Sequence, residues 1–296
     1  MGSACKNCNQ NSQGEPEIQL KPAQKVPSKQ TIVSNSGEQR KFIQDSIPLN
    51  PDDQELVKNA SVLSKFHKMQ MKNMGYYEGE WLNGMRHGQG IYTWSDNTVY
   101  TGQFQNDQLH GKGQIIHPNG DIYEGEWAND LANGFGIFKQ NNQSTYTGQW
   151  KDDLQHGDGI EEWPQQIKYE GQYVKGKKHG RGKIIFEDGS RYDGEFNNNQ
   201  ASGNGEFYWQ EGKYYKGQWK DNQMNGKGEM FWPDGKHYVG EYENDKKHGQ
   251  GQFTWENGKV YIGGWNQGKQ HGKGYIIEDS IKRECIFENG RLVNNI

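Results

Sequence analysis

The sequence has few of the residues from which a compact core is built. Only 30% of its 296 residues are hydrophobic, and the mean hydropathy is -1.18. A domain of this length with one central core would need more Leu, Ile and Val. No apolar run approaches the roughly 18 residues of a transmembrane helix, and the N-terminus is too polar for a secretory signal.

Cysteine is equally scarce. The chain has three cysteines, which are Cys5, Cys8 and Cys285. Three cysteines make no disulfide framework. The pair Cys5 and Cys8 has zinc-ligand spacing, but a structural zinc site needs four ligands and no second pair exists. We therefore expect no structural metal and no cofactor.

A basic surface is also missing from most of the chain. Residues 1–74 carry ten Lys and Arg against seven Asp and Glu, whereas residues 75–296 carry 24 against 31. Phosphate contacts require clustered positive charge, so nucleic acid is not an expected partner. We expect the protein in the cytosol or at a cytosolic membrane face.

Aromatic residues and glycine are abundant. The chain has 10 Trp, 16 Tyr, 11 Phe and 41 Gly. Disordered chains are poor in aromatics, so most of this one should fold. Many rings, many glycines and few aliphatic residues predict a thin structure in which flat rings cover the backbone.

These residues recur with a period of 23. The repeated tyrosines are Tyr77, Tyr100, Tyr123, Tyr146, Tyr169, Tyr192, Tyr215, Tyr238 and Tyr261. In all nine repeats glycine stands two, eleven and thirteen residues after the Tyr, and an aromatic residue stands four after it. A fixed period in this range indicates a repeat architecture.

Each repeat reads as a β-hairpin. In Tyr77-Glu78-Gly79-Glu80-Trp81 the rings and the glycine share one face and the two glutamates share the other. The central glycine leaves a slot for a ring. Seven residues after each Tyr stands Gly, Asn or Asp, which tolerate the positive φ of a turn. About eighteen short strands are expected.

The pattern Tyr-x-Gly-x-Trp-x-x-Gly-x-x-x-Gly-x-Gly resembles the MORN repeat (membrane occupation and recognition nexus). The resemblance covers residues 77–283 and implies an all-β fold, an elongated single-layer antiparallel meander of tandem hairpins. Residues 284–296 read as a degenerate C-terminal cap, which an open repeat stack needs. Phe287 stands there one residue earlier than the repeat would place it.

The resemblance also implies a function. It suggests a non-enzymatic scaffold or adaptor with protein partners, in a cytoskeletal, cortical or ciliary setting, and a homodimer. One alternative is a soluble axonemal component resembling radial-spoke head MORN proteins. Another is a regulatory partner of a phosphatidylinositol phosphate kinase, since MORN arrays accompany some of these enzymes.

The N-terminal region differs from the repeats. Residues 1–50 are rich in Gln, Asn, Ser, Lys and Pro and are expected to be disordered. Residues 51–74 begin with Asn50-Pro51-Asp52 and carry apolar residues every three or four positions, which predicts an amphipathic helix. We expect Leu56, Leu63 and Phe66 to dock this helix on the first repeats.

The chain starts Met1-Gly2-Ser3-Ala4-Cys5, which resembles an N-myristoylation signal. Lys6 departs from the pattern, where Ser or Thr is preferred. Gly2 would take the acyl chain, and Cys5 and Cys8 could take palmitate, which would make membrane attachment durable. The alternative is a tail with incidental cysteines.

Two further surfaces are candidate sites. The rings of the later repeats are expected to line an open groove for a partner: Tyr146, Trp150, Tyr169, Tyr173, Tyr192, Phe196, Tyr215, Trp219, Tyr238, Tyr242, Tyr261 and Trp265. A basic rim could contact anionic lipid, with a solvated turn as the alternative: Arg86, Lys177, Lys178, Lys246, Lys247 and Lys269.

No pattern points to catalysis. Six histidines precede the first glycine of Gly-x-Gly, but equivalent positions lie two strands, about 10 Å, apart and cannot share a metal whose ligands sit about 2 Å from it. Gly-x-Gly precedes a strand here, which argues against a dinucleotide site.

Overall fold

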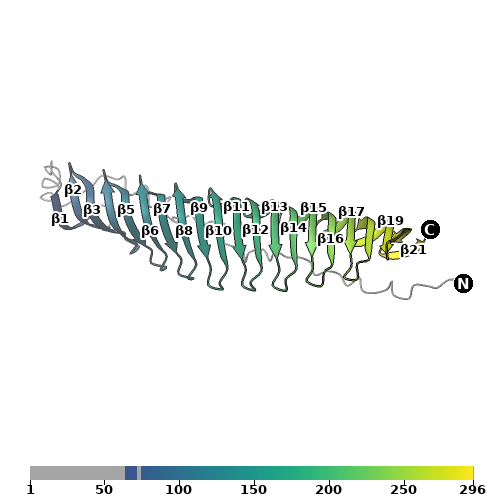
Figure 1. Cartoon of the computed structure of the whole chain (residues 1–296). Helices are drawn as coiled ribbons and strands as arrows, with labels where there is room; N and C mark the ends of the chain where they lie inside the picture. Colours follow the sequence, from purple (N-terminus) through teal and green to yellow (C-terminus); the bar gives the residue numbers. More distant parts are fainter. Residues whose placement is uncertain (1–63, 72–74, 296) are drawn as a thin grey trace. The chain divides into compact units, whose positions relative to one another are not determined.

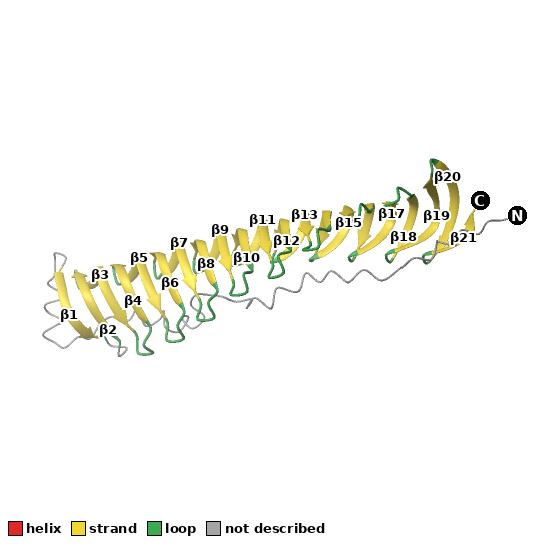
Figure 2. Ribbon diagram, turned by 60° about the horizontal axis from the view of Figure 1, so that its bottom comes forward, coloured by secondary structure: helices red, strands yellow, loops and turns green. Residues whose placement is uncertain are grey.

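The computed structural model describes residues 64–71 and 75–295. All of its regular elements are β-strands, coloured along the sequence in Figure 1 and by element type in Figure 2. The described part contains no helix that could cross a membrane. The chain divides into two compact units, with the boundary between Glu187 and Asp188.

The N-terminal unit is an antiparallel meander in which each strand pairs with the next along the chain. Its strands are β1 Ser64–Gln70, β2 Tyr76–Leu82, β3 Met85–Thr93, β4 Val99–Gln105, β5 Gln108–Ile116, β6 Ile122–Ala128, β7 Leu131–Lys139, β8 Thr145–Lys151, β9 Leu154–Glu162, β10 Lys168–Val174 and β11 Lys177–Ile185.

The C-terminal unit repeats this arrangement. Its strands are β12 Arg191–Asn197, β13 Gln200–Tyr208, β14 Tyr214–Lys220, β15 Gln223–Phe231, β16 His237–Glu243, β17 Lys246–Thr254, β18 Val260–Asn266, β19 Lys269–Glu278, β20 Ile281–Glu288 and β21 Arg291–Asn295. The predicted all-β antiparallel meander of hairpins is confirmed.

The turn inside each hairpin has the predicted backbone. All nine residues seven positions after the repeated Tyr have positive φ, from 64° at Asp153 to 81° at Gly268. In five repeats this residue also joins neighbouring repeats, as Asp107, Asp130, Asp153, Asn222 or Asp245. Asp153 donates its backbone N–H to the Ala132 carbonyl at 3.1 Å, and its Oδ1 accepts the Ala132 N–H at 2.8 Å. We call this reciprocal pair the turn staple.

The second strand of each repeat's hairpin, which we call the return strand, has a bulge at the two glycines of Gly-x-Gly. Gly102 pairs with Gly113 and the next residue, Gln103, pairs with His110, so the return strand holds two extra residues there. The bulge frees a backbone N–H, and a Glu or Gln side chain accepts it: Gln103 Oε1 lies 2.9 Å from the Lys112 nitrogen. Gly111 has φ +60°, and a Cβ there would collide with Gln103 Oε1. The positive φ and this collision each exclude a side chain at Gly111.

The slot predicted at the second glycine of the motif exists, but the repeat's own tyrosine fills it. The Tyr146 ring lies across Gly148 and its strand partner Gly159. A Cβ on Gly148 would stand 2.6 Å from Tyr146 Oη and 2.6 Å from the Gly159 Cα. The ring can lie flat because neither glycine has a side chain.

The predicted helix over residues 51–74 is wrong where it can be compared with the structure. Residues 64–70 form strand β1, while residues 51–63 lie outside the described residues. Phe66 pairs with Gly79 and Met69 pairs with Tyr77, so the strand holds one extra residue between them. The three-residue spacing of Phe66 and Met69, one of those that predicted a helix, spans this bulge. Met69 and Met71 are buried at the positions that Tyr92 and Trp94 occupy in the first repeat.

The other end of the array is closed by β20 and β21. The turn before β20 has only two residues, Asp279 and Ser280, whereas the equivalent turn before β18 has five. This shorter turn compensates for the early position of Phe287. Phe287 pairs with Gly272 and packs against Tyr261 at 5.2 Å, as Trp265 pairs with Gly249 and packs against Tyr238 at the same distance.

Replacing Gly148 with Val should destabilise the middle of the N-terminal unit, because the branched side chain would displace Tyr146 from the backbone. Overpacking of this kind costs about 1–3 kcal/mol. Hydrogen exchange of residues 145–162 would report it as faster opening. Thr147→Val, on the opposite face of the same strand, is the control, and equal exchange in the two variants would contradict the account.

Candidate functional site

The two faces of the sheet differ sharply. We call the face that carries the repeated tyrosines the inner face and the opposite one the outer face. On the inner face, the nine repeated tyrosines are each no more than 2% exposed. Each hydroxyl donates to the carbonyl three residues on, as Tyr215 does to Gln218 at 2.9 Å. The aromatic residue four positions on meets the ring edge to face, at 5.3 Å for Tyr215 and Trp219.

These contacts continue from one repeat to the next. Tyr100 packs edge to face on Phe104 of its own repeat and on Trp127 of the following one, at 5.2 and 5.5 Å. Such pairs contribute about 0.5–1.5 kcal/mol each beyond the area they bury. Several Trp nitrogens also donate to glycine carbonyls of the preceding repeat, as Trp150 does to Gly136 at 3.1 Å.

The prediction of an open aromatic groove is therefore wrong. All twelve rings assigned to it are buried, because they cover one another and the glycine backbone; they are Tyr146, Trp150, Tyr169, Tyr173, Tyr192, Phe196, Tyr215, Trp219, Tyr238, Tyr242, Tyr261 and Trp265. In this thin sheet they are the core. A partner that bound here would first have to separate rings that already contact each other.

Burial alters the acidity of the repeated tyrosines. It raises the pKa of all nine well above the ordinary value near 10, and the pKa of Tyr261 to about 12. The cause is loss of water around the charged phenolate. Nearby carboxylates such as Glu126 beside Tyr123 add to the effect.

The predicted basic rim divides into two groups. Lys177, Lys246 and Lys269 are exposed and remain candidates for lipid contact. Arg86, Lys178 and Lys247 are buried on the inner face, so their assignment to an exposed rim is wrong. Each lies over aromatic rings: the Arg86 guanidinium is 5.1 Å from the centre of the Tyr92 ring. Alternation along the strand turns Lys177 and Lys246 outward and the residues that follow them, Lys178 and Lys247, inward.

The outer face of the C-terminal unit carries a stack of side chains on five successive strands, β12 to β16. We call it the outer-face ladder: Arg191, Tyr208, Tyr214, Phe231 and His237. Arg191 lies 4.0 Å from the centre of the Tyr208 ring. The rings then stack almost parallel, with centroids 5.4, 4.4 and 4.2 Å apart.

Charged groups border the ladder. Tyr208 donates to Glu206 at 2.6 Å, and Lys216 lies 3.1 Å from the same carboxylate. The Tyr208 hydrogen bond and then Lys216 hold the pKa of Glu206 below its ordinary value. Glu229 lies 3.6 Å from His237. The ladder is thus half-buried. It is also amphipathic, because ring edges and ion pairs lie side by side on the same surface.

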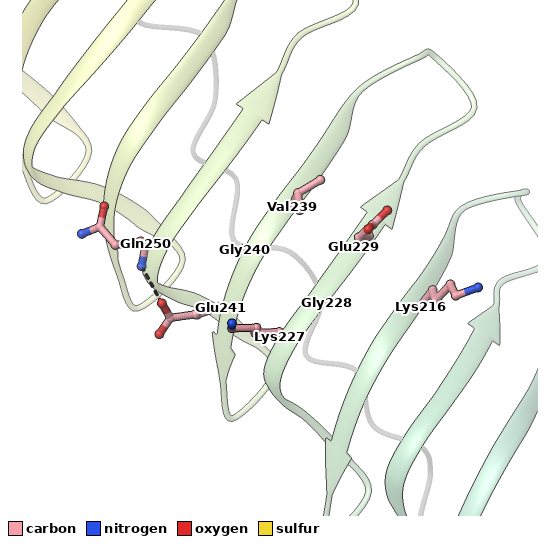
Figure 3. A pocket seen from close by; sticks show the side chains of 8 residues that line it. All are labelled: Lys216, Lys227, Gly228, Glu229, Val239, Gly240, Glu241 and Gln250. Atoms are coloured by element: carbon pink, nitrogen blue, oxygen red, sulfur yellow. Dashed lines mark hydrogen bonds between the residues drawn. The ribbon is translucent and has the colours of Figure 1, made fainter.

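A shallow hollow of about 370 Å³ adjoins the ladder (Figure 3). Lys216, Glu229 and Val239 stand along one side and Lys227, Glu241 and Gln250 along the other, with Gly228 and Gly240 between them. Val239 is 38% exposed, as is Ile262 two strands on, and Tyr275 is 36% exposed. The outer face of this unit therefore combines apolar and charged side chains.

Sequence reasoning did not identify the ladder. The signal was present, because Tyr208, Tyr214 and Phe231 all stand on outward positions close to a turn. The remaining predicted sites lie elsewhere. Gly2, Cys5 and Cys8 lie outside the described residues. In residues 64–71 and 75–295, no three His, Cys, Asp or Glu side chains gather in a way that could hold a metal ion.

A family model described as MORN repeat matches nine consecutive segments between residues 77 and 276. No curated protein matches the chain. Two similar solved structures are the TCP10 domain of Danio rerio CPAP with a STIL peptide and the Drosophila melanogaster SAS-4 TCP domain with a proline-rich motif of Ana2. Their identities are 11% and 12% and their TM-scores 0.43 and 0.34. The match includes 79% of this chain for the first structure and 68% for the second, and 99% of the chain in each of those structures.

The buried phenols predict steep alkaline unfolding. Folding holds the pKa of each repeated tyrosine above 10, so this stability is complete below pH 10 and is lost as the pH rises towards the folded pKa. Each such phenol contributes a slope of up to about 1.4 kcal/mol per pH unit. Absorbance at 295 nm should therefore show the buried phenolates appearing together with loss of the far-ultraviolet strand signal. Ionisation of these tyrosines in an intact sheet would contradict the prediction.

Proposed function

This chain belongs to the MORN-repeat family, and from that membership we propose that it is a non-enzymatic scaffold that binds protein partners and is tethered to a membrane by an acylated N-terminus. The observation that carries the proposal is the contrast between the two faces. On the inner face, the two rings of the motif recur in every repeat and are buried. The outer face changes from repeat to repeat and is accessible.

The outer face of the C-terminal unit supports partner binding. Exposed apolar area of this kind marks interaction sites on soluble proteins. Tyr, Trp and Arg are enriched among the residues that dominate binding energy, because they bury much area at little entropic cost. The ladder offers two tyrosines and an arginine, held in place by stacking, with Lys216 and Glu229 beside them to orient a partner.

The membrane tether rests on the sequence of the N-terminus. One acyl chain on Gly2 would bind a bilayer only weakly and reversibly, and a second lipid on Cys5 or Cys8 would make the attachment stable. The exposed Lys177, Lys246 and Lys269 could add contacts to anionic headgroups. A soluble axonemal component would need none of these groups.

Tyr214→Ser combined with Phe231→Ser should lower partner binding at least about tenfold, because aromatic anchors dominate such interfaces. The matched control is Thr145→Ser with Glu162→Ser, a cross-strand pair at the equivalent outward position of the N-terminal unit. Quantitative cross-linking in cells, read by mass spectrometry on the full-length protein, measures the partner. Equal recovery with both variants would exclude the ladder as the binding surface.

The intact mass of the native protein should show loss of Met1 and addition of an acyl chain at Gly2. Gly2→Ala should then release the protein from the membrane fraction, and Cys5→Ser with Cys8→Ser should weaken attachment by removing the second anchor. Ser3→Ala leaves the acceptor intact and is the control. An unmodified N-terminus with unchanged fractionation would favour the soluble axonemal role.

A further inference from the structure

One junction between repeats departs from all the others in the N-terminal unit. At each junction, two inner-face residues from neighbouring repeats lie next to each other. One stands fifteen residues after the Tyr of its own repeat, and the other stands nine residues after the Tyr of the following repeat. Elsewhere in this unit at least one of the two residues is apolar; the pairs are Tyr92 with Leu109, Ile115 with Ala132, and Phe138 with Gln155. Between the fourth and fifth repeats they are Glu161 and Lys178.

Glu161 and Lys178 form a buried ion pair. Lys178 Nζ lies 2.8 Å from Glu161 Oε2, and the two side chains are 8% and 7% exposed. Tyr173 donates its hydroxyl to the same oxygen at 2.8 Å. Burial, followed by the Glu161 charge, raises the pKa of Tyr173, so its phenol stays protonated and able to donate. The carboxylate thus has two hydrogen bonds in place of water.

Aromatic rings enclose the lysine. Its Nζ lies 4.9 Å from the centre of the Trp163 ring, 4.8 Å from that of Tyr169 and 5.5 Å from that of Tyr173. Cations over ring faces gain some energy, but a lysine among rings still requires an anion to offset the loss of water. Glu161 comes from β9 and Lys178 from β11, so the pair spans two repeats.

The same junction lacks the side-chain half of the turn staple. Gly176 donates its N–H to the Gln155 carbonyl at 2.9 Å, but it has no side chain to accept a bond in return. At the preceding junctions Asp107, Asp130 and Asp153 each accept such a bond, at 2.8 Å. At this junction Glu161 therefore provides polar side-chain links in place of the staple, through its ion pair with Lys178 and its hydrogen bond from Tyr173.

We infer that Glu161 and Lys178 fix the register in which the repeats assemble. The 23-residue repeats share one backbone, so a strand could pair with a hairpin one repeat too early and leave a repeat looped out. If the fourth repeat were skipped, Lys178 would meet Phe138 in place of Glu161. A buried ion pair adds little stability compared with apolar residues, whereas an unpaired buried charge is strongly destabilising. The pair therefore discriminates between registers more than it stabilises the correct one.

A double-mutant cycle in the full-length chain tests the pair itself. Glu161→Ile and Lys178→Leu should each raise the opening constant of residues 168–185 about 100-fold or more, measured by hydrogen exchange. The double variant, made together with Tyr173→Phe so that no buried hydroxyl loses its acceptor, should return to within about tenfold of the wild type, because apolar residues replace the whole group. A double variant as unstable as either single one would overturn the inference.

Removing a repeat tests the register. Deleting residues 146–168 from the otherwise full-length chain brings the third repeat against the fifth and leaves Lys178 without Glu161. Lys178→Leu should then lower the opening constant of residues 169–185 at least about 30-fold in this background. Deleting residues 100–122 is the control, because the ion pair stays intact and Asp130 takes the position of Asp107; there Lys178→Leu should still be harmful. Failure of Lys178→Leu to rescue the first deletion would refute the role in register.

Discussion

The structure depends on one contact, the tyrosine ring that lies flat across two paired glycines. Among the described residues no second layer covers the apolar face of the strands, so the rings cover the backbone directly. Only glycine permits a ring to come this close, and the repeated Gly-to-Gly pairing, such as Gly79 with Gly90, places two of them under each ring. The other ring of the motif then packs against the edge of the first. The core is thus a row of aromatic contacts one side chain deep.

The bulge follows from the same constraint. The return strand must bring its glycine under the ring and still reach the turn, and it does so by holding two extra residues. This leaves a backbone N–H that Glu or Gln on the outer face accepts, as Glu80 accepts the Gln89 N–H. One outer-face position in most repeats is therefore committed to the backbone. Other outward positions remain free to vary, and the outer-face ladder occupies those one residue before the repeated Tyr and opposite it on the return strand.

Much of this fold could be read from the sequence, because the constraints are local. Positive φ at the turns follows from Gly, Asn and Asp, and strand alternation follows from Tyr-x-Gly-x-Trp. The failures share one cause, which is that packing between strands is not local. Phe66 and Met69 have a helical spacing in the sequence, but they lie on a strand with a bulge between them. Arg86 and Lys178 looked like surface charges until neighbouring rings and carboxylates were placed around them. The same packing closed the groove that a list of rings suggested would be open.

The buried hydroxyls also decide which tyrosines a cell could modify. A kinase must draw the phenol out of the protein into its own active site, and the nine repeated tyrosines have theirs hydrogen-bonded beneath neighbouring rings. Phosphorylation there would require a hairpin to open first, and a phosphate could not return to a site between two glycines. Tyr76 and Tyr275 are exposed, and Tyr208 and Tyr214 are half-exposed on the ladder. A chain with sixteen tyrosines thus offers few of them to signalling in its folded state.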